Sequence, residues 1–256
     1  TRENLRRWVC LIAQVGRALT DRGAFQEVEY RKYFGSVAKW VTQIDDPDRV
    51  SELVARAFSV ATSGRPGPVV VALPEDMLRE MTRTPAARAV PALTAQASTV
   101  QIDAIVDELN GAKYPLIICG GGGWTDNGRD DLQAFAEAAK IPVICGFRNQ
   151  DLMDSTSNAY VGDASFGKPA AMQDLIAKSD CILALNIRFG EVITDGWEMF
   201  EFPHPKQKII HTHVSEAEIN KVYHCHLGVV AAPDTIVSGL RRATISCDWA
   251  TYMANA

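Results

Sequence analysis

The sequence has no pair of cysteines with metal-binding spacing. None of the six cysteines forms a CxxC pair, and their spacing matches no zinc motif. Four of them lie inside apolar runs, which predicts buried free thiols in core strands. Free thiols of this kind are typical of a reducing compartment, so we expect a cytoplasmic protein. The six are Cys10, Cys119, Cys145, Cys181, Cys225 and Cys247.

Long apolar runs and an excess of positive charge are also missing. No run approaches the ~18–20 residues that span a bilayer, and no signal-like apolar region follows the basic residues near the N-terminus. The formal net charge is −5, with 26 Lys and Arg against 31 Asp and Glu. We therefore expect no membrane and no nucleic acid as a partner.

The length and the charge distribution indicate more than one domain. A chain of 256 residues forms one large or two modest domains. Residues 1–90 carry 14 basic and 11 acidic side chains, whereas residues 91–256 carry 12 and 20. Residues 82–98, rich in Thr, Pro and Ala, keep no amphipathic period and are predicted to be a linker. The chain begins with Thr1 rather than Met, so we expect processing or a piece of something longer.

Apolar runs of strand length alternate with helical patterns on both sides of this linker. Before it, the pattern predicts strands at 8–13 and 69–74, an extended segment at 36–44, and a helix opened by Asp46 and Pro47. After it, the expected elements are helices at 99–110, 127–140, 169–178 and 215–221 and one opened by Pro233, strands at 115–119, 141–145, 180–186, 207–213 and 227–231, and an irregular stretch at 146–168. Repeated β-then-α units predict an α/β fold with parallel sheets flanked by helices.

Two segments at expected strand ends are candidates for ligand binding. Gly120-Gly121-Gly122-Gly123 follow a strand and precede a helix, where glycines let the backbone approach a phosphate. The spacing departs from GxGxxG, because Asp126 takes the place of the third glycine. Arg188 follows another strand and could hold a phosphate or a carboxylate. For each segment a structural role, as a tight turn or as an ion pair with a nearby acid, is an equal alternative.

The histidines and a polar loop carry weaker signals. His211 and His213 alternate on one face of a strand, and His224 and His226 follow. No third ligand is fixed by spacing, so pocket lining or packing is favoured over a metal site. No Ser/His/Asp or Cys/His arrangement is present. The segment 23–27 indicates only a loop with an exposed amide and an exposed carboxylate.

Taken in order, several motifs resemble those of a known family. Ala13-Gln14-Val15-Gly16-Arg17, then Ala24-Phe25-Gln26-Glu27, then residues 63–71 (SGRPGPVVV) and Leu73-Pro74-Glu75-Asp76 resemble the second half of a pyrimidine-binding domain. The domain is that of thiamine-diphosphate enzymes of the acetolactate synthase type. Residues 99–243 resemble the central domain of the same family. The resemblance covers nearly all of the chain.

The resemblance implies a domain plan and a chemistry. The plan is an incomplete N-terminal α/β domain at 1–81 that binds pyrimidine, a linker at 82–98, a Rossmann-like six-stranded central domain at 99–243, and a tail at 244–256. The family cleaves or forms bonds next to the carbonyl of a 2-oxo acid. Thiamine diphosphate carries that chemistry and Mg²⁺ anchors its diphosphate. Active sites form between two subunits, which implies a homodimer or homotetramer.

Two functional segments of the family have no match in the chain. The glutamate that activates the cofactor falls before the region matching Thr1, and the Gly-Asp-Gly…Asn motif for Mg²⁺ falls after the region matching Ala256. Gly162-Asp163-Ala164 lacks the second glycine and lies in the central domain. We therefore expect an internal fragment that is inactive in isolation and carries no metal site. Within it, the resemblance makes Phe25 and Gln26 the active-site residues.

FAD is a secondary expectation. Acetohydroxyacid synthases of the family bind FAD in the central domain, with the glycine run and a Gly-Ala-Arg-Phe-Asp-Asp segment. Here that segment reads Asn186-Ile187-Arg188-Phe189-Gly190-Glu191, so the first glycine and both aspartates are replaced. A standalone FAD- or nucleotide-binding module without catalysis is the alternative function. The residues that would form such a site are Gly120, Gly121, Gly122, Gly146, Phe147 and Arg188.

Overall fold

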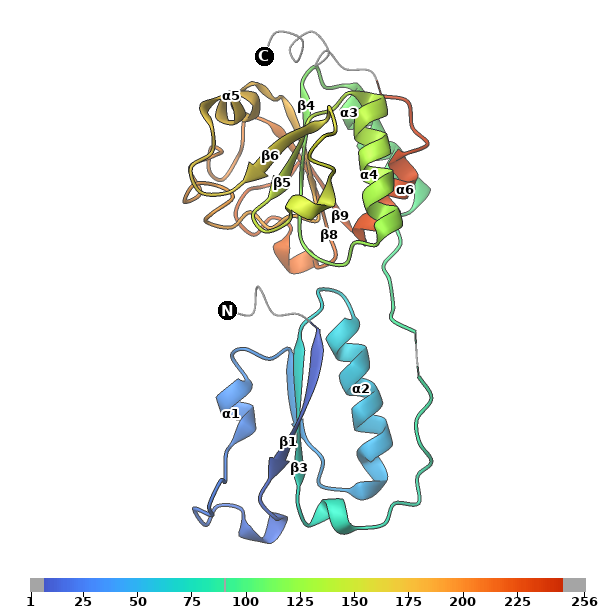
Figure 1. Ribbon diagram of the computed structural model, residues 1–256, viewed down its shortest axis with the longest axis vertical. Coiled ribbons are helices and arrows are strands. Elements are labelled where there is room, and N and C mark those ends of the chain that lie inside the picture. Colours follow the sequence, from blue (N-terminus) through green and yellow to red (C-terminus); the bar gives the residue numbers. More distant parts are fainter. Residues whose placement is uncertain (1–6, 90, 246–256) are drawn as a thin grey trace. The chain divides into compact units, whose positions relative to one another are not determined.

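The computed structural model describes residues 7–89 and 91–245. The chain forms two compact units, which divide between Thr94 and Ala95 (Figure 1). Within the described ranges, no helix has the length and apolar character that a membrane crossing requires. The finer domain boundaries expected at residues 81, 98 and 243 stay predictions, and the tail beyond residue 245 lies outside the described residues.

The N-terminal unit contains a three-stranded parallel sheet in the order β1-β3-β2. Its strands are β1 (Trp8–Gln14), β2 (Trp40–Gln43) and β3 (Pro68–Pro74), and its helices are α1 (Tyr30–Phe34) and α2 (Val50–Thr62). Nearly every residue of β3 is buried. Its run of valines is apolar on both faces, as a central parallel strand requires.

The predicted cap at Asp46 precedes a short 3-10 turn, and helix α2 itself begins three residues later than expected, at Val50. The carboxylate of Asp46 accepts a hydrogen bond from the backbone N–H of Asp48 at 2.9 Å, and Pro47 takes the first position of a short 3-10 turn that leads into α2. Leu53 and Ala57 lie on the buried face of the helix, against the sheet. The apolar stripe at helical spacing is thus what covers this side of the sheet.

The second unit contains six parallel strands in the order β6-β5-β4-β7-β8-β9. The strands are β4 (Pro115–Cys119), β5 (Val143–Gly146), β6 (Tyr160–Ala164), β7 (Cys181–Leu185), β8 (Lys208–His213) and β9 (Leu227–Val230). The helices are α3 (Thr99–Asn110), α4 (Asp126–Ala139), α5 (Ala170–Lys178) and α6 (Pro233–Leu240). This is the strand order of a Rossmann sheet, so the expected α/β class and the six-stranded domain are confirmed.

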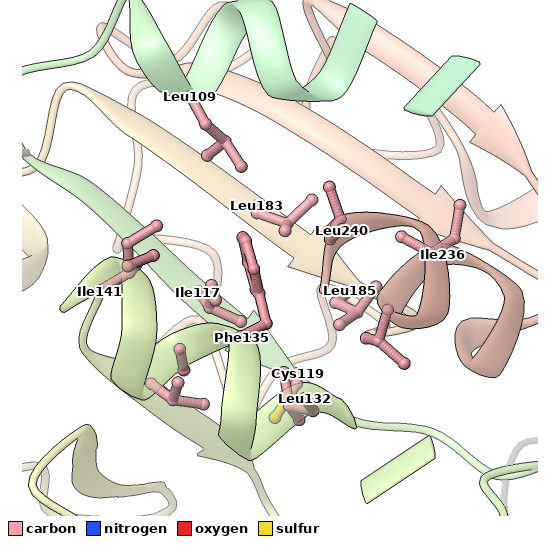
Figure 2. Close-up of a cluster of buried hydrophobic side chains, with 14 of the residues drawn as sticks. Leu109, Ile117, Cys119, Leu132, Phe135, Ile141, Leu183, Leu185, Ile236 and Leu240 are labelled. Atoms are coloured by element: carbon pink, nitrogen blue, oxygen red, sulfur yellow. The ribbon is translucent and has the colours of Figure 1, made fainter. Parts of the chain in front are cut away.

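Helices α3, α4 and α6 cover one face of this sheet. Leu132 and Phe135 of α4 pack with Leu183 and Leu185 of β7 and with Leu240 of α6 (Figure 2). Helix α5 and the loops that follow β7 and β8 pack on the other face. Each such fully buried side chain contributes roughly 1.5–3 kcal/mol by its removal from water. These apolar clusters on the two faces of the sheet hold its strands in place.

The structure departs from the expected elements in three places. The stretch 146–168 contains β6, which forms an edge of the sheet and pairs with β5 through a register shift at Val143/Ile144. Its half-buried residues and Gly162 dilute the apolar alternation on which strand recognition depends. The helix expected at 215–221 is only a 3-10 turn at Glu216–Glu218, and helix α1 was not expected.

No helix or strand lies within the described residues of the predicted linker, 82–89 and 91–98. Its two ends are nevertheless fixed to their own units. The hydroxyl of Thr82 and the backbone N–H of Arg83 donate to the Asp48 carboxylate at 2.9 and 2.8 Å. At the other end, Ala232 N–H donates to the carbonyl of Ala95 at 2.9 Å. The unattached length is therefore shorter than the composition suggests.

Candidate functional site

In the N-terminal unit, the loop that follows β1 presents two predicted active-site residues. The Glu27 carboxylate clamps this loop by accepting backbone hydrogen bonds from Asp21 at 2.6 Å and from Ala24 at 3.0 Å. These bonds lower the pKa of Glu27, because they favour its charged form. Gln26 has a φ of 67°, a left-handed conformation that turns the chain sharply at the tip of the loop.

The clamped loop exposes its tip. The Phe25 side chain is 90% exposed, and Gln26 is exposed as well. The base of the loop is fixed, since Gln14 Nε2 donates to Val28 O at 2.7 Å and the Tyr30 hydroxyl donates to Ala13 O at 2.9 Å. An aromatic ring held outward on an anchored loop is suited to contact with a second surface or a ligand. The active-site role of both residues stays a prediction.

An ion pair links two of the sequence motifs of this unit. Asp76, which follows β3, accepts from the backbone N–H of Arg17 at 2.9 Å and from its Nε at 2.8 Å. Arg17 also pairs with Glu80 and donates to the carbonyl of Asp45. These bonds raise the pKa of Arg17 and lower that of Asp76. One arginine thus joins the loops at the carboxyl ends of all three strands.

In the central unit, the glycines singled out by the sequence come together where the strand order reverses, between β4 and β7. Ligands of open α/β sheets bind at such a point. A Cβ atom on Gly120 or on Gly146 would lie 2.2 or 2.3 Å from Cδ1 of Ile187. A Cβ on Gly121, whose φ is 71°, would lie 2.3 Å from the carbonyl oxygen of Asn186. Three glycines therefore make room for the loop that follows β7.

The other two predicted residues of this edge have different surroundings. Nothing lies within 4 Å of the position of a Cβ on Gly122, which is exposed. Phe147 packs edge-on against Phe166, with ring centroids 5.8 Å apart, and the guanidinium of Arg148 lies 4.9 Å from its ring centroid. Whether these residues touch a ligand stays a prediction.

Asn186 organises the turn, which the sequence reasoning missed. It has a φ of 54° and is 1% exposed, and its Nδ2 donates to the carbonyls of Gly120 at 3.2 Å and Gly122 at 2.9 Å. His211 Nε2 lies 2.9 Å from the carbonyl of Ile187, so this nitrogen carries the proton and donates. Burial lowers the pKa of His211, because the charged imidazolium is poorly solvated there. The signal available in the sequence was Asn186 itself, which stands where the family's FAD-binding segment has its first glycine.

Arg188 faces an acid rather than the glycine run. Its Nε lies 3.4 Å from Oε2 of Glu218, a carboxylate 8% exposed, and Lys221 Nζ lies 3.4 Å from the same oxygen. The three charged side chains, with Trp197 and Tyr223, border a small cavity of about 50 Å³ that Phe189 and Val222 complete. The ion-pair alternative raised for Arg188 is the arrangement that the structure shows.

A buried lysine fixes the loop that follows Arg188. The Lys168 side chain is 0% exposed, and its Nζ donates to Asp195 Oδ1 at 2.6 Å and to the carbonyl of Val192 at 3.1 Å. Asp195 and Trp197 both have positive φ, with 50° and 68°. The lysine thus holds a strained loop at the carboxyl edge of the sheet. No motif in the sequence pointed to it.

The predicted thiols and histidines form no metal site in the part of the chain that the structure describes. In residues 7–89 and 91–245, no group of three or more His, Cys, Asp or Glu could hold a metal ion. Cys119, Cys145 and Cys181 are buried and free, as expected; Cys10 and Cys225 are half-buried, and Cys247 lies outside the described residues. Burial raises the pKa of Cys181 to about 12, so it stays a thiol.

Comparison with known proteins identifies the family. The family described as "Thiamine pyrophosphate enzyme, central domain" matches residues 102–240, which is more than half of the chain. This chain belongs to the thiamine pyrophosphate enzymes. The matched range runs from α3 to α6, so it contains the six-stranded sheet and the turn built around Asn186.

Similarity to individual relatives extends through both units. The acetolactate synthase large subunit of Corynebacterium glutamicum is 28% identical over 244 residues, which are 92% of this chain and 38% of that protein. The probable acetolactate synthase large subunit of Methanocaldococcus jannaschii is 27% identical, over 94% of this chain and 41% of its own. The large subunit of Escherichia coli acetolactate synthase isozyme 2 is 24% identical, over 96% and 44%. The chain thus spans less than half the length of these relatives.

Proposed function

We propose that this chain works within a carboligase or decarboxylase that uses thiamine diphosphate and Mg²⁺ to act on 2-oxo acids. The observation that carries the proposal is the collinear similarity to acetolactate synthase large subunits over 92–96% of the chain. Thiamine diphosphate, when bound, supplies the stabilisation of the carbanion next to the carbonyl. The similarity includes both units, which favours an enzyme over the alternative of a standalone nucleotide-binding module.

In this proposal the tip of the loop after β1 reaches the active site. Gln26 offers an amide that can donate to a carboxylate and accept from a hydroxyl or N–H. Phe25 covers the reacting groups with an apolar ring and excludes water from them. The clamp by Glu27 supports these roles, because it limits the conformations from which the two side chains approach.

The catalytic glutamate and the Mg²⁺ ligands belong, in this proposal, to segments that the relatives have in addition. Those relatives are more than twice as long as the matched region. The described residues of this chain offer no group of metal ligands, so the Mg²⁺ ligands are proposed to lie outside them. The chain by itself is proposed to be inactive.

We also propose that the active protein is a homodimer or homotetramer. Apolar side chains of the N-terminal unit support this proposal, since Trp8 and Leu11 of β1 are 42% and 56% exposed and Phe58 of α2 is 59% exposed. Exposed apolar groups of this size are common at protein interfaces. Light scattering of the active protein tests the state, and a monomer that turns over substrate contradicts it.

The decisive experiment compares the 256-residue chain with the product of the complete reading frame that contains it. We expect the latter to release CO₂ from pyruvate, used as a probe 2-oxo acid, only when thiamine diphosphate and Mg²⁺ are both present. The 256-residue chain should release none. Turnover without thiamine diphosphate, or turnover by the 256-residue chain itself, contradicts the proposal.

A further inference from the structure

The strand order of the central unit determines where the diphosphate of a bound dinucleotide would lie. At the point where the order of parallel strands reverses, the diphosphate lies against the N-terminus of the helix that follows the first strand. Here that helix is α4, which begins after Gly120–Gly123 with Thr125 as its N-cap. The free N–H groups and the positive end of α4 are thus what the diphosphate would need.

A carboxylate of the chain already lies at this helix end. Both oxygens of Asp234, in the first turn of α6, are 3.2 Å from the backbone nitrogen of Thr125. The Thr125 hydroxyl donates to Asp234 Oδ2 at 2.6 Å and accepts from the N–H of Gly128 at 3.1 Å. A Cβ on Gly128 would lie only 2.0 Å from Asp234 Oδ1. The carboxylate therefore rests directly on the first turn of α4.

Two N–H groups of the glycine run are likewise engaged within the chain. The N–H of Gly120 donates to Leu185 O at 3.1 Å, and that of Gly121 donates to Asn149 Oδ1 at 3.3 Å. Because Asn186 Nδ2 donates to two carbonyls, the orientation of its amide is fixed, and Oδ1 is an acceptor. This oxygen is buried without a hydrogen-bond partner among the described residues. A lone acceptor repels a phosphate oxygen and does not bind one.

Arg188, a cation at this edge, is also engaged. It pairs with Glu218, which Lys221 approaches too, so its positive charge is partly neutralised by a buried carboxylate. We infer that Asp234 takes the place of a ligand's phosphate at the N-terminus of α4, and that this crevice does not hold the diphosphate of FAD. The residues present do not fit the expected flavin. The inference is independent of the proposed thiamine diphosphate chemistry.

Flavin fluorescence tests whether the chain binds FAD. FAD is titrated into the 256-residue chain, and we expect no saturable quenching up to about 1 mM, the concentration at which even a binding free energy near −4 kcal/mol would register. Saturable quenching within this concentration range overturns the inference. This readout needs no enzymatic activity, so its failure is distinct from failure of the proposed function.

Substitution of Asp234 tests whether its carboxylate occupies an anion site at the N-terminus of α4. In Asp234→Ala the helix end is open, so we expect Tm to fall and then to rise by about 2–4 °C as inorganic phosphate replaces chloride at constant ionic strength. The wild type and Asp103→Ala, which removes an exposed carboxylate from α3, should show no such rise. A variant no more sensitive to phosphate than the wild type overturns the inference.

A second variant covers the case in which Asp234→Ala does not fold. Asp234→Asn keeps the shape of the side chain and removes only its charge, so we expect Tm to fall by about 2–4 °C. An unchanged Tm for Asp234→Asn overturns the claim that an anion is what this helix end requires.

Discussion

The guanidinium Nε of Arg17 lies 2.8 Å from Oδ2 of Asp76, and this ion pair joins the loop after β1 to the loop after β3. The two residues belong to motifs almost 60 positions apart in the chain. The pair anchors the base of the segment whose tip carries Phe25 and Gln26. Its first consequence is a dependence of stability on pH.

Asp76→Asn should flatten the acid limb of the stability curve. The bonds from Arg17 lower the pKa of Asp76 from its ordinary 3.8. The stability from this group is therefore present above pH 3.8 and is lost as the pH falls through the lowered pKa. The wild type should lose Tm more steeply than Asp76→Asn between pH 4 and pH 2, as measured by calorimetry. Glu75→Gln, an exposed neighbour, is the matched control and should keep the wild-type slope.

Gln26→Ala should slow the complete enzyme without unfolding it. The side chain is exposed and the clamp of the loop comes from Glu27, so Tm should not change. If the amide holds a reacting group, kcat should fall by roughly 10–100-fold. Arg22→Ala, in the same exposed loop, should leave kcat unchanged. Equal kinetics for Gln26→Ala and wild type would refute the active-site role.

Substitutions at the adjacent Gly121 and Gly122 should differ sharply in their cost in unfolding free energy. Gly121 has a φ of 71°, and a Cβ there would lie 2.3 Å from a backbone oxygen that cannot move aside cheaply. Gly121→Ala should therefore cost at least about 1–2 kcal/mol of unfolding free energy. Gly122→Ala meets nothing within 4 Å and should stay within about 0.5 kcal/mol of wild type. Urea unfolding measures both, and equal midpoints would contradict this account of the turn.

The central unit should lose stability in mild acid through His211. Burial lowers its pKa from the ordinary 6.5, so the unfolded chain binds this proton first as the pH falls. The stability is full above pH 6.5 and declines as the pH falls through the lowered pKa. His211→Gln should make Tm less dependent on pH between 7 and 5, whereas His204→Gln, at an exposed position, should not. A wild type whose Tm is constant over this range would disprove the role of His211.

The elements could be predicted where local pattern and burial agree. Helix α3 and strand β4 have the bounds that the sequence predicts, because their apolar residues repeat with the period of one element and are buried accordingly. Strand β6 escaped detection, since its half-buried residues and Gly162 leave only a weak apolar pattern. The expected strand ends located the glycine run, and the family motifs located the loop of Phe25 and Gln26.

The sequence by itself determined the alternation of strands and helices, and with it the α/β class and the family, because periodicity and motif order are local properties of the chain. Only the tertiary structure decided what the glycines and charges contact. Asn186 reaches Gly120 across 66 positions, Thr125 meets Asp234 across 109, and Lys168 is buried against Asp195. Such contacts depend on which strands become neighbours. The order β6-β5-β4-β7-β8-β9 fixes that, and no local pattern encodes it.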